Sequence, residues 1–490
     1  MEHLENCRDG TGKEGSSRST TPDGHIDSPE MDRNPSPPPD GDGSEGEDAI
    51  GETVYSKHWL FSVLTRLIEV VKGQPDEDGG QMELSEEQED ELCKVWDMAM
   101  DEDVAGFLQE FKAPDILLGV MAKSCCPRLT EICVGILGNM ACFPDTCLSL
   151  SQNSDLCDVL LLLLGDNDPP TLLETCRLLL TCISQPNVAS LWLDRIRQQA
   201  PVCSNLCFIM CSSTNVDLLL KVGELVDKLM DEDEELMKGW LRTLPSETER
   251  VGDTPQGIAS ALLEAAKQLR CESPEGLEVY LHALQLLTTV DEGVHSLVSD
   301  GGCGTALWTF VSEVVCDDLC QPDDPPLILH EQKGLLAPAL ALLSALYSCL
   351  QCHISLSLVG SVLRILQYHT ECVQCRTEQQ TDSDREKEEA RDEQREAAET
   401  DVQLQALEES AAEFLSSILT DLSKDVMSDL VKKGLLTERN CLTAAKTLIP
   451  QHSSAMKHWL SMLSESEPNL ADVVRKECSL PAEPNQTDPN

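Results

Sequence analysis

The chain has 490 residues, with 87 acidic and 36 basic side chains and a formal net charge of −51. This charge repels nucleic-acid phosphates, and aromatic residues, on which single-stranded bases stack, make up only 3% of the chain. We therefore expect no nucleic-acid binding, and we expect basic proteins or peptides to be the favoured partners.

The 23 cysteines stand mostly inside apolar runs, where thiols behave as small hydrophobic side chains. Their odd number and the length of the chain disfavour a disulfide-stapled secreted scaffold and favour a reducing compartment. The first thirty residues contain no apolar core of a signal peptide. The most apolar run, 334–350, is shorter than the roughly 20 residues of a membrane span. We expect an intracellular protein with no membrane partner.

Residues 1–52 are rich in Gly, Ser, Pro and Asp, which predicts a disordered acidic tail. Its Thr-Pro and Ser-Pro steps at Thr21, Ser28 and Ser36 are either phosphorylation sites or ordinary turn-forming sequence. A first helix is predicted over 53–71. Ser85, with Gln88 three residues later, has the pattern of a capping box before the next helix.

One helical phrase then recurs at the spacing of an α-solenoid. The copies are EICVGILGNMA (131–141), ETCRLLLTCIS (174–184), KVGELVDKLMD (221–231) and, less cleanly, LHALQLLTTVD (281–291). A small residue is followed three and seven positions later by aliphatic residues, which is one face of an α-helix. The first two intervals, 43 and 47 residues, match HEAT and armadillo units. Asp168, Asn187 and Ser273 are expected to cap helices in this region.

The third interval is 60 residues, and it contains the polar, turn-rich segment 244–256. Without those 13 residues the interval is 47, so we interpret the segment as a loop inserted into one repeat. The predicted fold is therefore all-α, an armadillo- or HEAT-like solenoid over 53–369. Residues 370–401 are predicted to be an acidic, solvated linker with transient helix, residues 402–478 helices that continue or cap the solenoid, and residues 479–490 a disordered tail.

The strongest candidate for a metal site is the set Cys349, Cys352, Cys372 and Cys375, because two C-x2-C pairs at this separation occur in zinc ribbons. A helix predicted over 354–368 would hold the pairs roughly 22 Å apart, however, so ordinary core and surface thiols are the favoured interpretation. No Walker A, zincin or nucleophile-elbow motif occurs. We expect no catalytic residues, no cofactor and no enzyme activity.

Two further features allow a binding role. Asn139 falls where armadillo repeats carry the asparagine of their peptide-binding ladders, but the aligned positions are Cys182, Leu229 and Thr289, so one asparagine does not make such a groove. The acidic run DEDEE (231–235) could contact a basic peptide or form a solvated helix start, and the second interpretation is favoured.

Several long segments resemble one known family. They are MDRNPSPPPD (31–40), TVYSKHWLF (53–61), VWDMAMDEDVAGFLQEF (95–111), RLTEICVGILGNMACF (128–143), DPPTLLETCRLLLTC (168–182), SSTNVDLLLKVGELVDKL (212–229) and LQLLTTVDEG (284–293). They are similar to the serum amyloid A-like protein 1 family over residues 31–431. The resemblance implies an armadillo-type, nuclear protein without known catalytic activity that promotes cell (fibroblast) proliferation in response to pro-inflammatory stimuli.

The leading interpretation is therefore a non-enzymatic scaffold that binds a protein or peptide on its repeats. An RNA-associated regulator of transcript levels is the alternative, since helical repeats can read single strands. A zinc-binding protein is a third.

Overall fold

The computed structural model describes residues 48–72, 84–242, 257–299, 302–321, 326–350, 352–382 and 391–478. They all belong to one compact unit, Gly43–Asn490. Helices and turns account for this part of the chain, which has no strand; Ala49 and Ser56 form an isolated antiparallel bridge. The predicted all-α class is confirmed.

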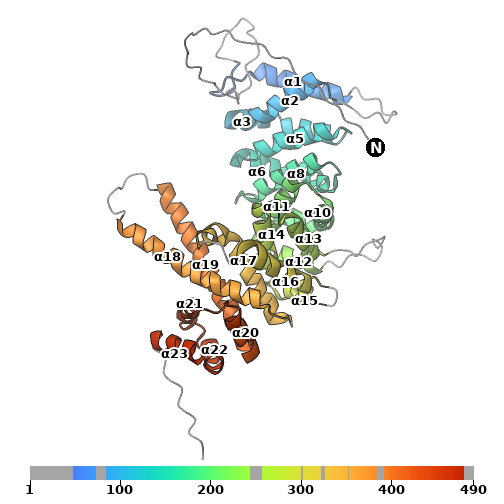
Figure 1. Ribbon diagram of the computed structural model, residues 1–490. Helices are drawn as coiled ribbons and strands as arrows, with labels where there is room; N and C mark the ends of the chain where they lie inside the picture. The colour runs from blue at the N-terminus through green and yellow to red at the C-terminus, as the bar shows by residue number, and fades with distance from the viewer. Residues whose placement is uncertain are drawn as a thin grey trace, which may run out of the picture. The chain divides into compact units, whose positions relative to one another are not determined.

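Short helices follow one another along the chain (Figure 1). In the N-terminal half they are α1 Lys57–Lys72, α2 Glu86–Met98, α3 Glu102–Glu110, α4 Ala113–Met121, α5 Pro127–Met140, α6 Pro144–Gln152, α7 Ser154–Leu162, the 3-10 turn η1 Leu163–Gly165, α8 Pro169–Ile183, α9 Ala189–Gln198, α10 Pro201–Ser212, α11 Val216–Glu232 and α12 Glu234–Arg242. In the C-terminal half they are α13 Ile258–Leu269, α14 Pro274–Leu287, α15 Asp291–Val298, α16 Gly304–Glu313, the π-helix η3 Val314–Leu319, α17 Pro326–Cys349, α18 Leu356–Asp382, α19 Arg391–Asp421, α20 Lys424–Lys432, α21 Glu438–Leu448, α22 Ser453–Ser466 and α23 Pro468–Glu477.

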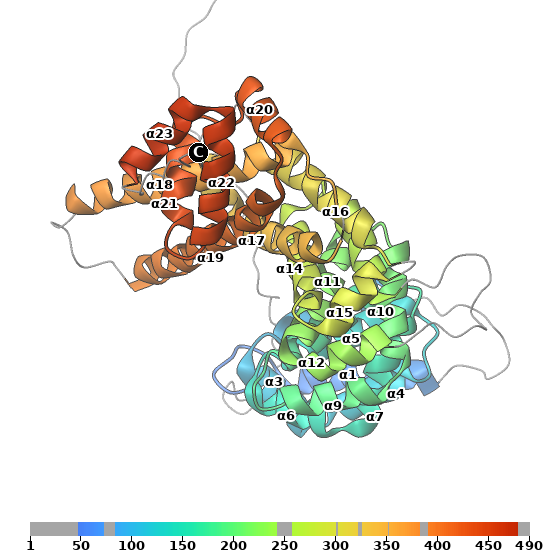
Figure 2. The ribbon, with the colours of Figure 1, turned by 90° about the horizontal axis from the view of Figure 1, so that it is seen from below.

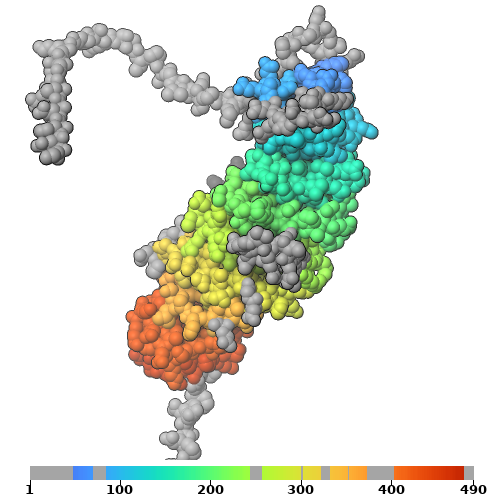
Figure 3. All heavy atoms as spheres, turned by 90° about the vertical axis from the view of Figure 1, so that its right-hand side faces the viewer, coloured from blue at the N-terminus to red at the C-terminus, as the bar shows by residue number. Residues whose placement is uncertain are grey.

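A set of these helices, which we call the ladder helices, pack one on the next in chain order. They are α2, α5, α8, α11, α14, α17, α19 and α22 (Figure 1). Others form a second layer, in which α1 packs on α4, α4 on α7, α10 on α13, and α9 on α12; Figure 2 looks along this stack. Consecutive parts of the chain form consecutive bands of the surface in Figure 3. This is the predicted α-solenoid, in which each repeat packs on its neighbours.

The four copies of the repeated phrase fall on four consecutive ladder helices, α5, α8, α11 and α14. The small residue that begins the helical pattern of each copy is buried, and Cys133, Cys176 and Ala283 are each 0% exposed. The phrase is therefore the contact surface between repeats, as its periodicity predicts.

Two glycines allow neighbouring ladder helices to approach closely. The Tyr280 ring on α14 lies against Gly223 on α11, and the Tyr280 hydroxyl donates a hydrogen bond of 2.8 Å to the Leu219 carbonyl. The Trp96 ring on α2 lies against Gly135 on α5 in the same way. A side chain at either glycine would occupy the space of the ring.

Several expected helix caps are present. Ser85 and Gln88 form the predicted capping box of α2, and the side chains of Asp168 and Ser273 accept hydrogen bonds from the first turns of α8 and α14. These bonds satisfy backbone N–H groups that a helix start leaves without partners.

The expectation for Asn187 was wrong. Helix α9 begins at Ala189, and its cap residue is Val188, which makes no side-chain bond. The chain turns directly out of α8 here, because the N–H groups of Val188 and Ala189 both donate to the carbonyl of Gln185. Asn187 lies inside that turn and does not start the helix.

The boundaries of the predicted segments differ in detail from the helices. Ile50 is 2% exposed and Lys57 N–H donates to the Asp48 carbonyl, so packed structure begins before the expected end of the tail at 52. Two helices extend into the predicted 370–401 linker. Helix α18 continues to Asp382, and α19 begins at Arg391. Residues 1–47, with their Ser-Pro and Thr-Pro steps, the inserted loop 244–256 and the tail 479–490 lie outside the described residues.

In the part of the chain that the structure describes, no single helix has the length and apolar composition of a bilayer span. The bent pair formed by α6 and α7 with η1 meets those criteria together, with an angle of 87° between its members.

The contact between Gly223 and Tyr280 predicts opposite effects of two similar substitutions. A Cβ at Gly223 would lie 2.6 Å from Tyr280 Cε2, so Gly223→Ala should lower the free energy of unfolding by about 1–3 kcal/mol. Gly119 on α4 has open space around an added Cβ, so Gly119→Ala should raise it by about 0.5–1 kcal/mol. Urea denaturation followed by circular dichroism measures both, and shifts of the same sign would contradict the close contact.

Candidate interaction surface

The ladder helices carry a row of side chains that are exposed or half-buried, and we call this row the ladder face. Its members are Trp96, Arg128, Glu131, Glu174, Arg177, Lys221, Glu224, Asp227, Asp231, Glu278 and His282. On each helix they are spaced three, four or seven residues apart, which places them on one side. The surface thus runs from α2 to α14 without a break in helix order.

At its N-terminal end the ladder face combines an indole ring with two arginines. Arg128 forms ion pairs with Glu89 on α2 at 2.8 Å and with Glu131 at 2.7 Å. Arg177 on α8 pairs with Glu174 at 2.6 Å and donates to the Gly135 carbonyl at 3.2 Å. Each arginine therefore joins its helix to the preceding ladder helix while remaining half-exposed.

Asn139 does not belong to this surface. It is 5% exposed, and its Nδ2 donates a hydrogen bond of 2.8 Å to the Trp96 carbonyl of α2. The aligned Cys182 and Leu229 are 0% exposed. The amide joins two helices, in agreement with the expectation that a single asparagine does not make an armadillo-type peptide groove.

The next two ladder helices carry paired charges of opposite order. On α8, Glu174 precedes Arg177; at the aligned positions of α11, Lys221 precedes Glu224, and each pair forms an ion pair within its own helix. The basic side chains here are therefore neutralised by acidic neighbours.

Acidic side chains predominate where α11 meets α14. His282 Nδ1 lies 2.7 Å from Asp227 Oδ1, and this hydrogen bond raises the pKa of His282 above its usual value; the nearby carboxylates of Asp231 and Glu278 act in the same direction. Burial raises the pKa of Glu278, and the Lys333 ammonium opposes that effect. The basic group of the ladder face that interacts with these carboxylates is thus the His282 imidazole, and Lys333 acts on Glu278 from outside the ladder face.

The acidic run 231–235 has a structural role. Asp233 is 6% exposed, accepts a hydrogen bond of 2.9 Å from Leu236 N–H at the start of α12, and binds Arg197 of α9 at 2.5 Å. Glu234 and Glu235 are exposed and both pair with Lys238. Residues 233–235 form the start of α12, as favoured, and Asp231 and Glu232 end α11. The pair of the buried Asp233 with the exposed Arg197 could not be predicted from the sequence.

Of the four cysteines of the metal hypothesis, two precede α18 and two lie within it. Cys349 ends α17 and Cys352 lies between the helices, whereas Cys372 and Cys375 are within α18, which starts at Leu356. At 1.5 Å per residue, Cys372 is roughly 24 Å from the start of α18. Among the residues whose side chains the structure describes, which do not include Cys372 and Cys375, no group of three or more His, Cys, Asp or Glu side chains could hold a metal ion.

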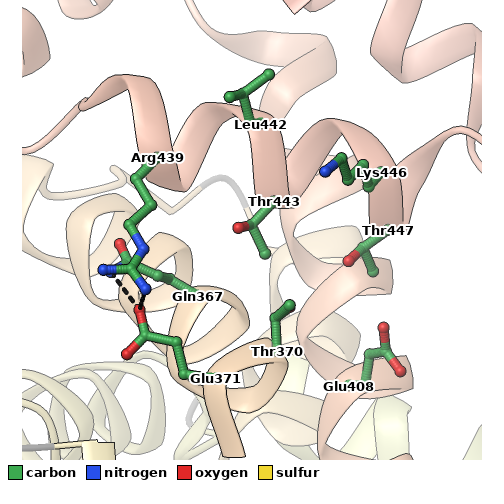
Figure 4. A pocket seen from close by; sticks show the side chains of 9 residues that line it. All are labelled: Gln367, Thr370, Glu371, Glu408, Arg439, Leu442, Thr443, Lys446 and Thr447. Atoms are coloured by element: carbon green, nitrogen blue, oxygen red, sulfur yellow. Dashed lines mark hydrogen bonds and ion pairs between the residues drawn. The ribbon is translucent and has the colours of Figure 1, made fainter. Parts of the chain in front are cut away.

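A groove of about 380 Å³ lies between α18, α19 and α21 (Figure 4). Its lining residues are Gln367, Thr370, Glu371, Glu408, Arg439, Leu442, Thr443, Lys446 and Thr447. The Glu371 carboxylate accepts hydrogen bonds from Arg439 at 2.8 Å and from Gln367 at 2.9 Å. His369 is buried and does not line the groove. Its Nδ1 is 3.9 Å from the Glu408 carboxylate, and burial lowers the pKa of His369.

This groove can hold a polar group between hydroxyls, an ammonium and carboxylates, but its described lining offers no nucleophile beside a general base. The groove could not be predicted from the sequence, because its residues come from three helices and occupy ordinary polar positions on each of them. We therefore regard the ladder face as the principal candidate site.

The pair of His282 and Asp227 predicts a pH-dependent contribution to stability. Because the folded-state pKa of His282 is raised, the stabilisation is present below the ordinary value near 6.5 and is lost as the pH rises through the folded-state pKa. His282→Gln should therefore destabilise the protein more at pH 5.5 than at pH 9, as measured by urea denaturation. His458→Gln, at an exposed histidine on α22, is the control, and equal pH dependence in both variants would contradict the role of the pair.

A family model described as the SAAL1 C-terminal domain matches residues 202–456. Among curated proteins, the chain is 63% identical to Protein saal1 of Danio rerio over 457 residues, which cover 92% of this chain and 95% of that protein. It is 47% identical to Protein SAAL1 of Homo sapiens over 470 residues, which cover 91% and 98% of the two chains.

Solved structures of designed proteins are also similar. A designed armadillo repeat protein aligns with a TM-score of 0.39 and 16% identity over 58% of this chain and 99% of its own. A second engineered protein aligns with a TM-score of 0.40 and 14% identity over 85% and 98% of the two chains.

Proposed function

This chain belongs to the SAAL1 family, and we propose that it is a non-enzymatic scaffold whose ladder face binds a protein or peptide of basic character. The observation that supports the proposal is the row of exposed side chains across consecutive ladder helices. A solenoid offers such a surface to extended partners because each repeat adds its own contacts.

The charge of the ladder face favours a basic partner. Arg128, Arg177 and Lys221 are each paired with a glutamate, so they have little attraction left for an anionic ligand. Asp231 and Glu278 are exposed, His282 is the basic group of the ladder face that interacts with them, and Lys228 and Lys333 lie near them outside the ladder face. Together with the net charge of −51, this pattern should accelerate encounter with basic proteins and repel nucleic acid.

We place this scaffold in the nucleus, where it would promote cell proliferation in response to pro-inflammatory stimuli, as the resemblance to its family implies. Imaging of the tagged full chain, before and after cytokine treatment of fibroblasts, should show nuclear signal, and depletion of the protein should slow proliferation. Exclusion of the tagged chain from the nucleus under both conditions would contradict this placement.

The ladder-face proposal predicts that neutral substitutions reduce partner binding. The double variant Asp231→Asn, Glu278→Gln removes two carboxylates of the ladder face and should recover roughly three- to tenfold less of the basic partners that the wild-type chain captures from nuclear extract. Quantitative mass spectrometry of the captured proteins measures the loss. The difference between the wild type and the double variant should be smaller at high salt, because screening weakens the attraction between carboxylates and basic partners.

The matched control changes the net charge equally on other helices. Asp158 on α7 and Glu264 on α13 are exposed and lie on helices of the second layer, so Asp158→Asn, Glu264→Gln should bind as the wild type does. If both double variants lose binding to the same extent, net charge and not the ladder face attracts the partners. If the wild-type chain captures no stoichiometric partner, the scaffold proposal fails.

A further inference from the structure

Two buried thiols from different helices lie in contact. Cys147 is on α6 and Cys182 is on α8, and their Sγ atoms are 3.8 Å apart. Both residues are 0% exposed. A disulfide has an S–S bond of about 2.05 Å, so the two sulfurs would need to approach by about 1.7 Å to form one.

The surroundings of the pair fix α6 in place. The Ser151 hydroxyl, one turn after Cys147, accepts a hydrogen bond of 2.8 Å from the Trp192 indole of α9. The Ser151 carbonyl accepts one of 2.6 Å from Arg195, which also contacts the Cys157 thiol at 3.0 Å. The thiol contact is therefore held by the packing of several helices.

Cys147 also differs electrostatically from its neighbours. Its hydrogen bond with Cys182 lowers the pKa of the Cys147 thiol, although burial opposes this effect. The same bond and burial raise the pKa of Cys182, and burial raises the pKa of Cys157 to about 11. Since the thiolate is the reactive form, Cys147 is the expected nucleophile of the pair.

We propose that Cys147 and Cys182 are a redox modification site, at which a hydroperoxide converts the two thiols into a disulfide that joins α6 to α8. This site is independent of the ladder face and of the proposed partner binding. Because neither thiol touches solvent, the reaction requires a local opening of α6, which sets its rate.

The reaction balances with one hydroperoxide. The Cys147 thiolate attacks the terminal oxygen of the hydroperoxide, so an S–O bond forms, the O–O bond breaks, and the leaving hydroxide or alkoxide takes up a proton to become water or an alcohol. The Cys182 sulfur then attacks the resulting sulfenic acid; the S–S bond forms, the S–O bond breaks, and water leaves with the thiol proton. Two thiols lose two electrons and the peroxide gains them. A dithiol reductant restores the thiols by exchange.

Another thiol pair shows what makes this one distinctive. Cys203 and Cys207 are also hydrogen-bonded, but both belong to α10, so a bond between them would constrain a single helix. Cys147 and Cys182 are 35 residues apart in sequence, with α7 between their helices. Their disulfide would tie α6 to α8 across that segment.

The test is a peptide map of the full chain after treatment with hydrogen peroxide and blocking of free thiols. Cleavage before aspartates and after arginines gives peptides 145–154 and 178–193, which contain Cys147 and Cys182 as their only cysteines. We expect these two peptides to be linked, with a mass roughly 2 Da below their sum, and to separate after dithiothreitol. The oxidised protein should also melt at a higher temperature than the reduced protein, because the cross-link restricts the unfolded chain.

Two kinds of variant check the assignment. Cys147→Ser and Cys182→Ser should each abolish the linked peptides, whereas Cys142→Ser should retain them, because Cys142 is an exposed neighbour outside the pair. The wild-type map alone suffices if either variant fails to fold. Peroxide-treated wild type without linked peptides, or links from Cys182 to Cys142 in place of Cys147, would overturn the proposal, as would loss of the link in Cys142→Ser.

Discussion

The close contact between successive ladder helices is the constraint on which the rest of the structure depends. A single helix of this chain cannot bury its own apolar face, and each ladder helix from α5 to α19 is covered by the one before and the one after it. Gly135 and Gly223 let a Trp96 or Tyr280 ring from the neighbouring helix lie directly on the backbone. The exposed charges of the ladder face can form one surface only because this contact brings the helices together.

The chain has 36 basic residues against 87 acidic ones, and several of the basic residues connect helices. Arg128 joins α5 to α2, Arg197 joins α9 to the start of α12, and Arg270, directly after α13, pairs with Glu313 and Asp318. These pairs leave the unpaired surface acidic. These pairs therefore contribute to the cohesion of the stack.

The stack could be predicted from the sequence because its signal is local. The phrase in α5, α8, α11 and α14 has the period of a helix and the spacing of a repeat, and the caps Ser85 and Asp168 lie a few residues from the groups they bind. The site was less predictable, because its contacts join residues from separate helices. The pairs of Asp233 with Arg197, and of Cys147 with Cys182, depend on the relative placement of helices 35 or more residues apart. Asn187 misled the prediction since a local preference for capping could not reveal the turn that follows α8.

The reversed charge order of α8 and α11 has a consequence for the fidelity of folding. Helices as similar as these could in principle exchange places, or stack on the equivalent helix of another molecule. With Glu174 and Arg177 aligned to Lys221 and Glu224, α8 against α11 brings unlike charges to corresponding positions, whereas either helix against its own copy would bring like charges together. The charge order thus distinguishes α8 from α11 at positions where their apolar faces are alike.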